Sequence, residues 1–95
     1  MRDLSQARAD FSAVSAAVWR ISPDCSQDEW WRVAAALFNA FGDDAFDLFD
    51  EWSSTAKTPG MYPGRKGCWA KWCFCRNYSQ IGVGTIFHFA KGRSA

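Results

Sequence analysis

Apolar side chains recur every three or four residues through the first part of this chain. The series begins with Leu4, Ala7 and Phe11 and keeps the same spacing to Ile21. Such a stripe lies along one side of an α-helix, whereas a half-buried strand alternates with a period of two. No alternating segment longer than a few residues occurs in the 95 residues. The pattern therefore predicts an all-α fold.

Boundary signals predict where the helices begin and end. The pair Ser22-Pro23 ends the first helix, because proline disfavours helical backbone in the residue before it. Residues 26–29, Ser-Gln-Asp-Glu, form a capping-box pattern that starts a second helix. Gly42 suits the end of that helix. The carboxylates of Asp43 and Asp44 suit the positive end of a third helix dipole.

The remainder of the chain predicts a loop and two further helices. Residues 56–67 hold two Pro and three Gly, which excludes a regular element there. A fourth helix is expected from Cys68 to about Tyr78, and a short last helix from Thr85 to Lys91. The expected architecture is a compact bundle of about five helices with the Pro/Gly-rich loop between helices three and four. It forms one domain over residues 1–95, with a core of about 10–92 and frayed ends.

The net charge of +1 conceals a division between two halves. All ten carboxylates lie before residue 52, together with four arginines, which gives −6. The last 44 residues hold seven cations and no acid, which gives +7. Such an asymmetry indicates an anionic partner.

Aromatic residues are interleaved with these cations. Cations that track phosphates and rings that stack on bases are typical of proteins that bind single-stranded nucleic acid. Arg65 and Lys66, on a loop flanked by glycines, are best suited to contact phosphate. In the alternative reading the cations are a solvated face, and Trp69 or Trp72 belongs to the core. The full set of candidate nucleic-acid-binding residues is Lys57, Arg65, Lys66, Trp69, Lys71, Arg76 and Lys91.

The sequence assigns no metal, no cofactor and no catalytic residue. Cys68, Cys73 and Cys75 with His88 suggest zinc, but on a helix Cys73 points about 140° away from Cys68. Small, buried, reduced thiols are expected instead. The acidic run from Asp43 has a spacing that suits Mg²⁺, and is equally typical of an exposed helix start. No segment reaches the ~18 apolar residues of a membrane span, and no signal peptide is recognised, so a cytoplasmic location is expected.

Four motifs together resemble one known family. They are Trp30-x-x-Val33-x-x-Ala36-Leu37, then Phe46-Asp47-Leu48-Phe49-Asp50-x-Trp52-Ser53, then Trp72, then Gly84-Thr85-Ile86-Phe87-His88-x-Ala90-Lys91. Over about residues 10–92 they resemble the primase C-terminal 2 (PriCT-2) domain. That helical module occurs in replication proteins of phages and plasmids, beside a primase core or a helicase ATPase.

The resemblance implies a role in DNA replication. The expected function is a non-catalytic accessory domain of a DNA primase that binds template or single-stranded DNA through the basic, aromatic C-terminal half. One alternative is an adaptor that links the primase core to a replicative helicase through the acidic third helix. Another is a nucleotide-hydrolysing unit, because the family has been linked to hydrolysis of acid anhydrides.

Overall fold

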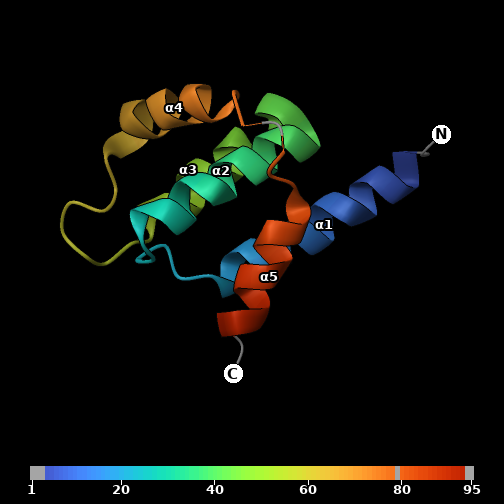
Figure 1. The fold of residues 1–95 in the computed structure, drawn as a ribbon, viewed down its shortest axis with the longest axis horizontal. Helices are drawn as coiled ribbons and strands as arrows, with labels where there is room; N and C mark the ends of the chain where they lie inside the picture. The colour runs from blue at the N-terminus through green and yellow to red at the C-terminus, as the bar shows by residue number, and fades with distance from the viewer. Residues whose placement is uncertain (1–3, 79, 94–95) are drawn as a thin grey trace.

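The chain is all-α in a computed structural model that describes residues 4–78 and 80–93, with side chains for 11–78 and 80–91. No strand occurs in these ranges, which confirms the predicted fold class (Figure 1). Of the ends that were expected to fray, residues 1–3 and 94–95 lie outside the described residues, whereas residues 4–9 belong to α1 and residue 93 belongs to α5. The elements, in chain order, are α1 (Leu4–Arg20), α2 (Gln27–Phe41), the 3₁₀-helix η1 (Gly42–Ala45), α3 (Phe46–Ser54), α4 (Gly64–Cys75) and α5 (Val83–Arg93).

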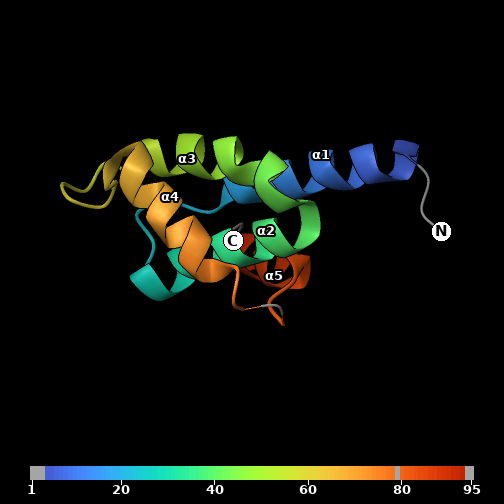
Figure 2. The same ribbon diagram turned by 90° about the horizontal axis from the view of Figure 1, so that it is seen from above.

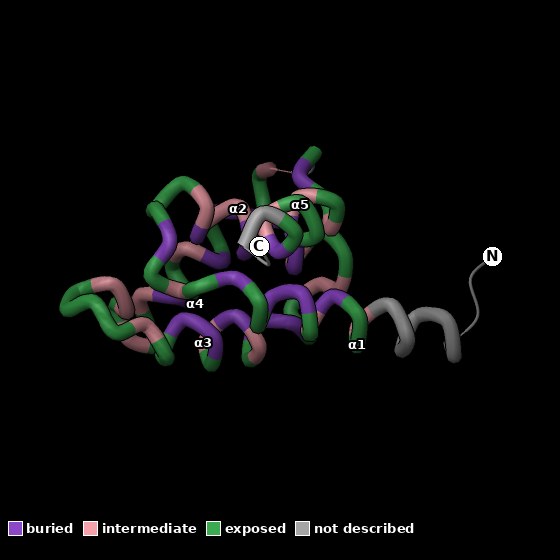
Figure 3. The backbone as a smooth tube through the Cα atoms, turned by 90° about the horizontal axis from the view of Figure 1, so that it is seen from below, coloured by how far each residue is buried: buried purple, intermediate pink, exposed green. Residues whose placement is uncertain are grey.

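Helix α2 lies at the centre of the molecule. It packs against α3, α4 and α5, while α1 packs against α5 (Figures 1 and 2). Helices α4 and α1 lie at opposite ends in both views. The radius of gyration is 12.7 Å, as expected for a compact chain of this length. The central position of α2 explains why residues 33–37 of this helix are all buried (Figure 3).

The predicted boundaries of α2 are confirmed. Ser26 Oγ accepts a hydrogen bond from the Glu29 backbone amide at 3.1 Å. The Glu29 carboxylate accepts one from the Ser26 amide at 3.4 Å, which completes the capping box. Gly42 follows the helix with a φ of 69°, a conformation that costs glycine little and other residues more. Two local signals thus define this helix.

Boundaries after Gly42 differ from the prediction. Asp43 and Asp44 lie in η1, so α3 begins only at Phe46. The predicted loop was wrong over residues 64–67, which form the first turn of α4. Gly67 is required there, because an added Cβ would come within 2.5 Å of Pro63 Cβ. Helix α4 ends at Cys75, and the chain continues to Tyr78 in turns.

The last helix is longer than predicted. Residues 83–84 already belong to α5, which also continues past Lys91. Gly92 therefore does not stop this helix, although its low helix propensity suggested that it would. The predicted limits of 85–91 were too narrow at both ends.

Aromatic rings join α2, α3 and α4 in the core. The ring of Phe49 lies 5.6 Å from that of Trp72 and 5.2 Å from that of Trp30. Trp52 is fully buried, and its indole N–H donates to the Ile21 carbonyl at 2.8 Å. Trp72 is likewise fully buried, whereas Trp69 is 42% exposed. Trp72 is therefore the core tryptophan of α4, which answers the question that the sequence left open.

Candidate nucleic-acid interface

Helix α4 carries most of the predicted site residues and distributes them over two flanks. Its core side is formed by Cys68, Trp72 and Cys75, all fully buried. The flank towards α3 presents Trp69 and Arg76, preceded by Arg65. The opposite flank, towards α2, presents Lys71 with Phe74. These two flanks are separate surfaces, so the candidates on α4 do not form a single patch.

Arg65 is paired with α3. Its guanidinium donates to Asp47 at 2.7 Å and to Asp50 at 3.0 Å. It also lies 4.9 Å from the centre of the Phe46 ring. The hydrogen bond to Asp47 raises the pKa of Arg65 above its usual value. The side chain of Asp50 is only 13% exposed and also accepts a 2.8 Å hydrogen bond from the Tyr62 hydroxyl. Because two carboxylates already bind Arg65, its charge is partly neutralised before any partner binds.

Arg76 is paired in a similar way. Its guanidinium donates to Asp43 Oδ1 at 2.6 Å, and the same oxygen accepts the Trp72 indole N–H at 2.8 Å. The guanidinium also lies 5.0 Å from the Phe38 ring centre and 5.5 Å from that of Trp69. Planar guanidinium groups favour such stacking on rings. Arg76 therefore has a structural role in joining η1 and α2 to the end of α4.

The acidic run therefore mostly supplies counter-ions to the arginines on α4 and just after it. Asp43, Asp47 and Asp50 come from the negative half of the sequence and bind arginines of the positive half. Asp44 and Glu51 stay exposed. No cluster of three or more metal-ligating side chains occurs among the described residues. The charge separation along the chain is accordingly smaller in space than in sequence.

Lys66 and Trp69 border a small hollow beside the paired Arg65. The hollow is lined by Phe46, Arg65, Lys66 and Trp69. The Trp69 ring meets the Phe46 ring edge-on at 4.9 Å, and Lys66 is exposed. Lys66 makes no ion pair with any described residue. The hollow therefore combines an exposed indole with an available ammonium group.

Lys57 and Lys91 lie apart from α4. Lys57 is in the loop after α3, where its backbone amide and that of Thr58 donate to the Asp24 carboxylate at 3.1 and 2.8 Å. These hydrogen bonds lower the pKa of Asp24. The Lys57 side chain stays exposed, and Lys91 is exposed on α5. The seven candidates are therefore spread over the loop, α4 and α5.

The thiols are mostly buried, as expected. Cys25, Cys68 and Cys75 are buried, while Cys73 is exposed on α4. Burial raises the pKa of both Cys68 and Cys75 to about 11, so both carry a proton at neutral pH. A buried, protonated thiol is a poor nucleophile. These cysteines therefore act as small apolar core groups.

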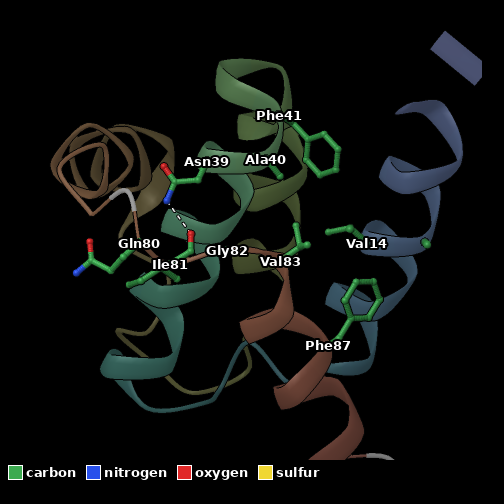
Figure 4. A pocket seen from close by; sticks show the side chains of 10 residues that line it. Val14, Asn39, Ala40, Phe41, Gln80, Ile81, Gly82, Val83 and Phe87 are labelled. Atoms are coloured by element: carbon green, nitrogen blue, oxygen red, sulfur yellow. Dashed lines mark hydrogen bonds between the residues drawn. The ribbon is translucent and has the colours of Figure 1, made fainter. Parts of the chain in front are cut away.

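A larger hollow lies between α1, α2 and the segment that leads into α5 (Figure 4). Asn39 fixes that segment, since its amide donates to the carbonyls of Ile81 and Tyr78, both at 2.7 Å. Val14, Phe41 and Phe87 supply apolar surface to the lining, which contains no charged side chain. The lining of this hollow therefore offers no cation to a phosphate.

The fold and the surface of α4 define a small helical module whose exposed functional groups are lysines and aromatic rings. Residues 14–90 match the sequence model of the family described as Primase C terminal 2 (PriCT-2), and the chain belongs to this family. The match confirms the resemblance seen in the sequence motifs. No curated protein and no solved structure gave a match. Within the described parts of the chain, every helix is too short or too polar to cross a bilayer.

Proposed function

We propose that the chain is a non-catalytic accessory domain of a phage or plasmid DNA primase that binds template DNA through α4. Membership of the PriCT-2 family supports a role beside a primase. One observation carries the DNA-binding part: Lys66 and Trp69 border the same exposed hollow, on a helix with no carboxylate. Acting beside a primase core or a replicative helicase, the domain would work in the cytoplasm without a cofactor.

The chemistry of this surface suits a phosphate backbone with unpaired bases. Lysine ammonium groups bind phosphate as point charges and release condensed counter-ions. Trp69 offers a ring next to them. Lys71, Lys57 and Lys91 add positive potential from the same half of the chain. Arg65 and Arg76 contribute less, because carboxylates of α3 and η1 already occupy them.

The test is a titration of labelled single-stranded DNA at about 50 mM salt, repeated at about 200 mM salt. The double variant Lys66→Glu/Lys71→Glu should weaken binding at least about fivefold and flatten the salt dependence. Arg20→Glu, on the exposed end of α1, is a control for charge alone and should change affinity less than about twofold. No binding at low salt, or a double variant that binds like the original chain, would overturn the proposal.

Arg65 is a poor choice for this experiment. Arg65→Glu would place a carboxylate beside Asp47 and Asp50, one of which is nearly buried. Repulsion there would disturb the α3–α4 packing and confuse a loss of binding with a loss of folding. Lys66 and Lys71 avoid that problem, because neither makes an ion pair with a described residue.

The two alternative functions have less support. In an adaptor role the acidic third helix would have fewer carboxylates to offer a protein partner, because Asp47 and Asp50 already bind Arg65. The adaptor role would be favoured if binding to a helicase persists at high salt but is lost in the Asp47→Lys/Glu51→Lys variant. A nucleotide-hydrolysing role would require turnover of a nucleoside triphosphate with Mg²⁺ by the isolated chain.

A further inference from the structure

Three aromatic rings form a continuous row on the α2 flank of α4. Phe74 of α4 lies 5.5 Å from Tyr78, and Tyr78 lies 4.8 Å from Trp31 of α2, measured between ring centres. Successive rings are tilted by 53° and 51°. Neither Trp31 nor Tyr78 belongs to the set of site residues predicted from the sequence. The row joins parts of the chain more than forty residues apart, so no local sequence pattern reveals it.

A cation lies at each end of this row. The Lys71 ammonium is 5.1 Å from the Phe74 ring centre, and the Arg32 guanidinium is 4.9 Å from that of Trp31. Lys71 makes no ion pair with a described residue. Arg32 binds Asp28 at 3.0 Å, but the Asp28 side chain is 65% exposed, so this surface pair is weak. Two cations thus lie within reach of any anion placed along the rings.

Two hydrogen bonds to backbone carbonyls hold the row in place. The Cys75 thiol donates to the Trp31 carbonyl at 3.4 Å, which ties α4 to α2. Asn39 donates to the Tyr78 carbonyl at 2.7 Å. The outer ring is accessible, since Phe74 is 50% exposed, and Trp31 and Tyr78 are half-buried. A surface fixed in this way loses little conformational freedom when a ligand binds.

A hollow continues from the Phe74 end of the row. It lies between the first turn of α2, the loop before α4 and α4 itself, and is lined among others by Gln27, Met61, Ala70, Lys71 and Phe74. The rings and the hollow together form one strip along α4. Asp28 lies at its α2 end, where it binds Arg32, and the chain after residue 51 contributes no acid.

We propose that this strip, consisting of Trp31, Tyr78 and Phe74 with Lys71 and Arg32, stacks the unpaired bases of single-stranded nucleic acid. The inference rests on the proposed DNA binding and adds a second contact surface, on the flank of α4 opposite Lys66 and Trp69. Rings can stack on the faces of unpaired bases, whereas a duplex hides those faces between its base pairs. Lysines alone bind both forms through phosphate. The strip therefore makes the domain selective for single strands.

The first test compares a single strand of about 12 nucleotides with the matching duplex. Phe74→Ala and Phe74→Leu should each weaken single-strand binding about five- to tenfold, because base stacking is lost. Phe74→Tyr should retain binding, and duplex binding should not change in any of the three. Phe87→Ala is the matched control, since Phe87 is 44% exposed on α5, away from the strip. All these variants keep the charge of the chain.

A second readout locates the contact directly. Single strands containing iodouracil, irradiated in the complex, should crosslink to Trp31, Phe74 or Tyr78, as mapped by mass spectrometry. Single-strand binding that is unaffected by Phe74→Ala would overturn the inference while leaving the proposed function intact. No binding of either form of DNA would overturn both. A proline-rich peptide whose binding is abolished by Phe74→Ala, with DNA binding unchanged, would identify a protein ligand and also overturn the inference.

Discussion

The indole N–H of Trp30 donates a 2.9 Å hydrogen bond to the hydroxyl of Ser53, deep between α2 and α3. Trp30 is 4% exposed and Ser53 is 1% exposed, so water cannot replace either partner. Ser53→Ala would leave the indole N–H unpaired in the core. The expected loss is about 1–3 kcal/mol in the free energy of unfolding, measured by urea denaturation.

A double-mutant cycle tests whether that loss comes from the hydrogen bond. Trp30→Phe removes the donor, and the double variant Trp30→Phe/Ser53→Ala removes both partners. If the bond is responsible, the double variant should be less destabilised than the sum of the two single variants, with a coupling of about 1 kcal/mol. Additive losses would instead indicate that packing alone carries the effect.

Two aspartates that share Arg65 should differ in their contribution to stability. The Asp50 side chain is 13% exposed and binds both Arg65 and Tyr62, whereas that of Asp47 is 82% exposed and binds Arg65 alone. Asp50→Asn should lower the free energy of unfolding by about 1–2 kcal/mol. Asp47→Asn should lower it by less than about 0.5 kcal/mol, since exposed pairs contribute little. Equal urea midpoints for the two variants would contradict this difference in burial.

Asp24 should make stability depend on pH at the acidic end. Its folded-state pKa is lowered, chiefly by the backbone amides of Lys57 and Thr58. The carboxylate therefore stabilises the fold at pH values above its unfolded pKa, near 3.8, and this contribution is lost as the pH falls through the lower folded value. Asp24→Asn should lower the urea midpoint at neutral pH, and the difference should shrink steadily on acidification below pH ~4. Asp44→Asn, at an exposed carboxylate, is the matched control.

Thiol labelling should separate Cys73 from the other three cysteines. Cys73 is exposed, whereas Cys25, Cys68 and Cys75 are buried, and burial raises the pKa of Cys68 and Cys75 to about 11. Iodoacetamide reacts with the thiolate, so at neutral pH one equivalent should add quickly to the folded chain. Intact mass should show one rapid addition, and four after unfolding in urea. Rapid addition of two or more to the folded chain would contradict the described burial.

Local signals predicted the first two helices well. The 3–4 spacing to Ile21, the capping box at Ser26 and the glycine at position 42 each act within one or two helical turns. They needed no knowledge of the tertiary structure. The start of α4 could not be predicted in this way, because Gly64 and Gly67 disfavour helix. In that turn Pro63 packs on Gly67, and Arg65 binds α3, which is a tertiary contact.

The site was harder to predict than the fold. Sequence patterns located the cations and rings of α4. They could not show that Arg76 meets Asp43, thirty-three residues away, or that Tyr78 meets Trp31. A charge count along the chain treats each half as a unit, whereas ion pairs depend on which helices pack together. For this reason both candidate arginines, Arg65 and Arg76, proved to be internally paired.

The pairing of Asp47 and Asp50 of α3 with Arg65 of α4 also bears on how the chain reaches its folded state. An unfolded chain with a negative first half and a positive second half attracts itself over long distances, particularly at low ionic strength. This attraction favours the encounter of the segments that form α3 and α4. During synthesis the acidic half leaves the ribosome first, and its counter-ions follow only with the last third of the chain.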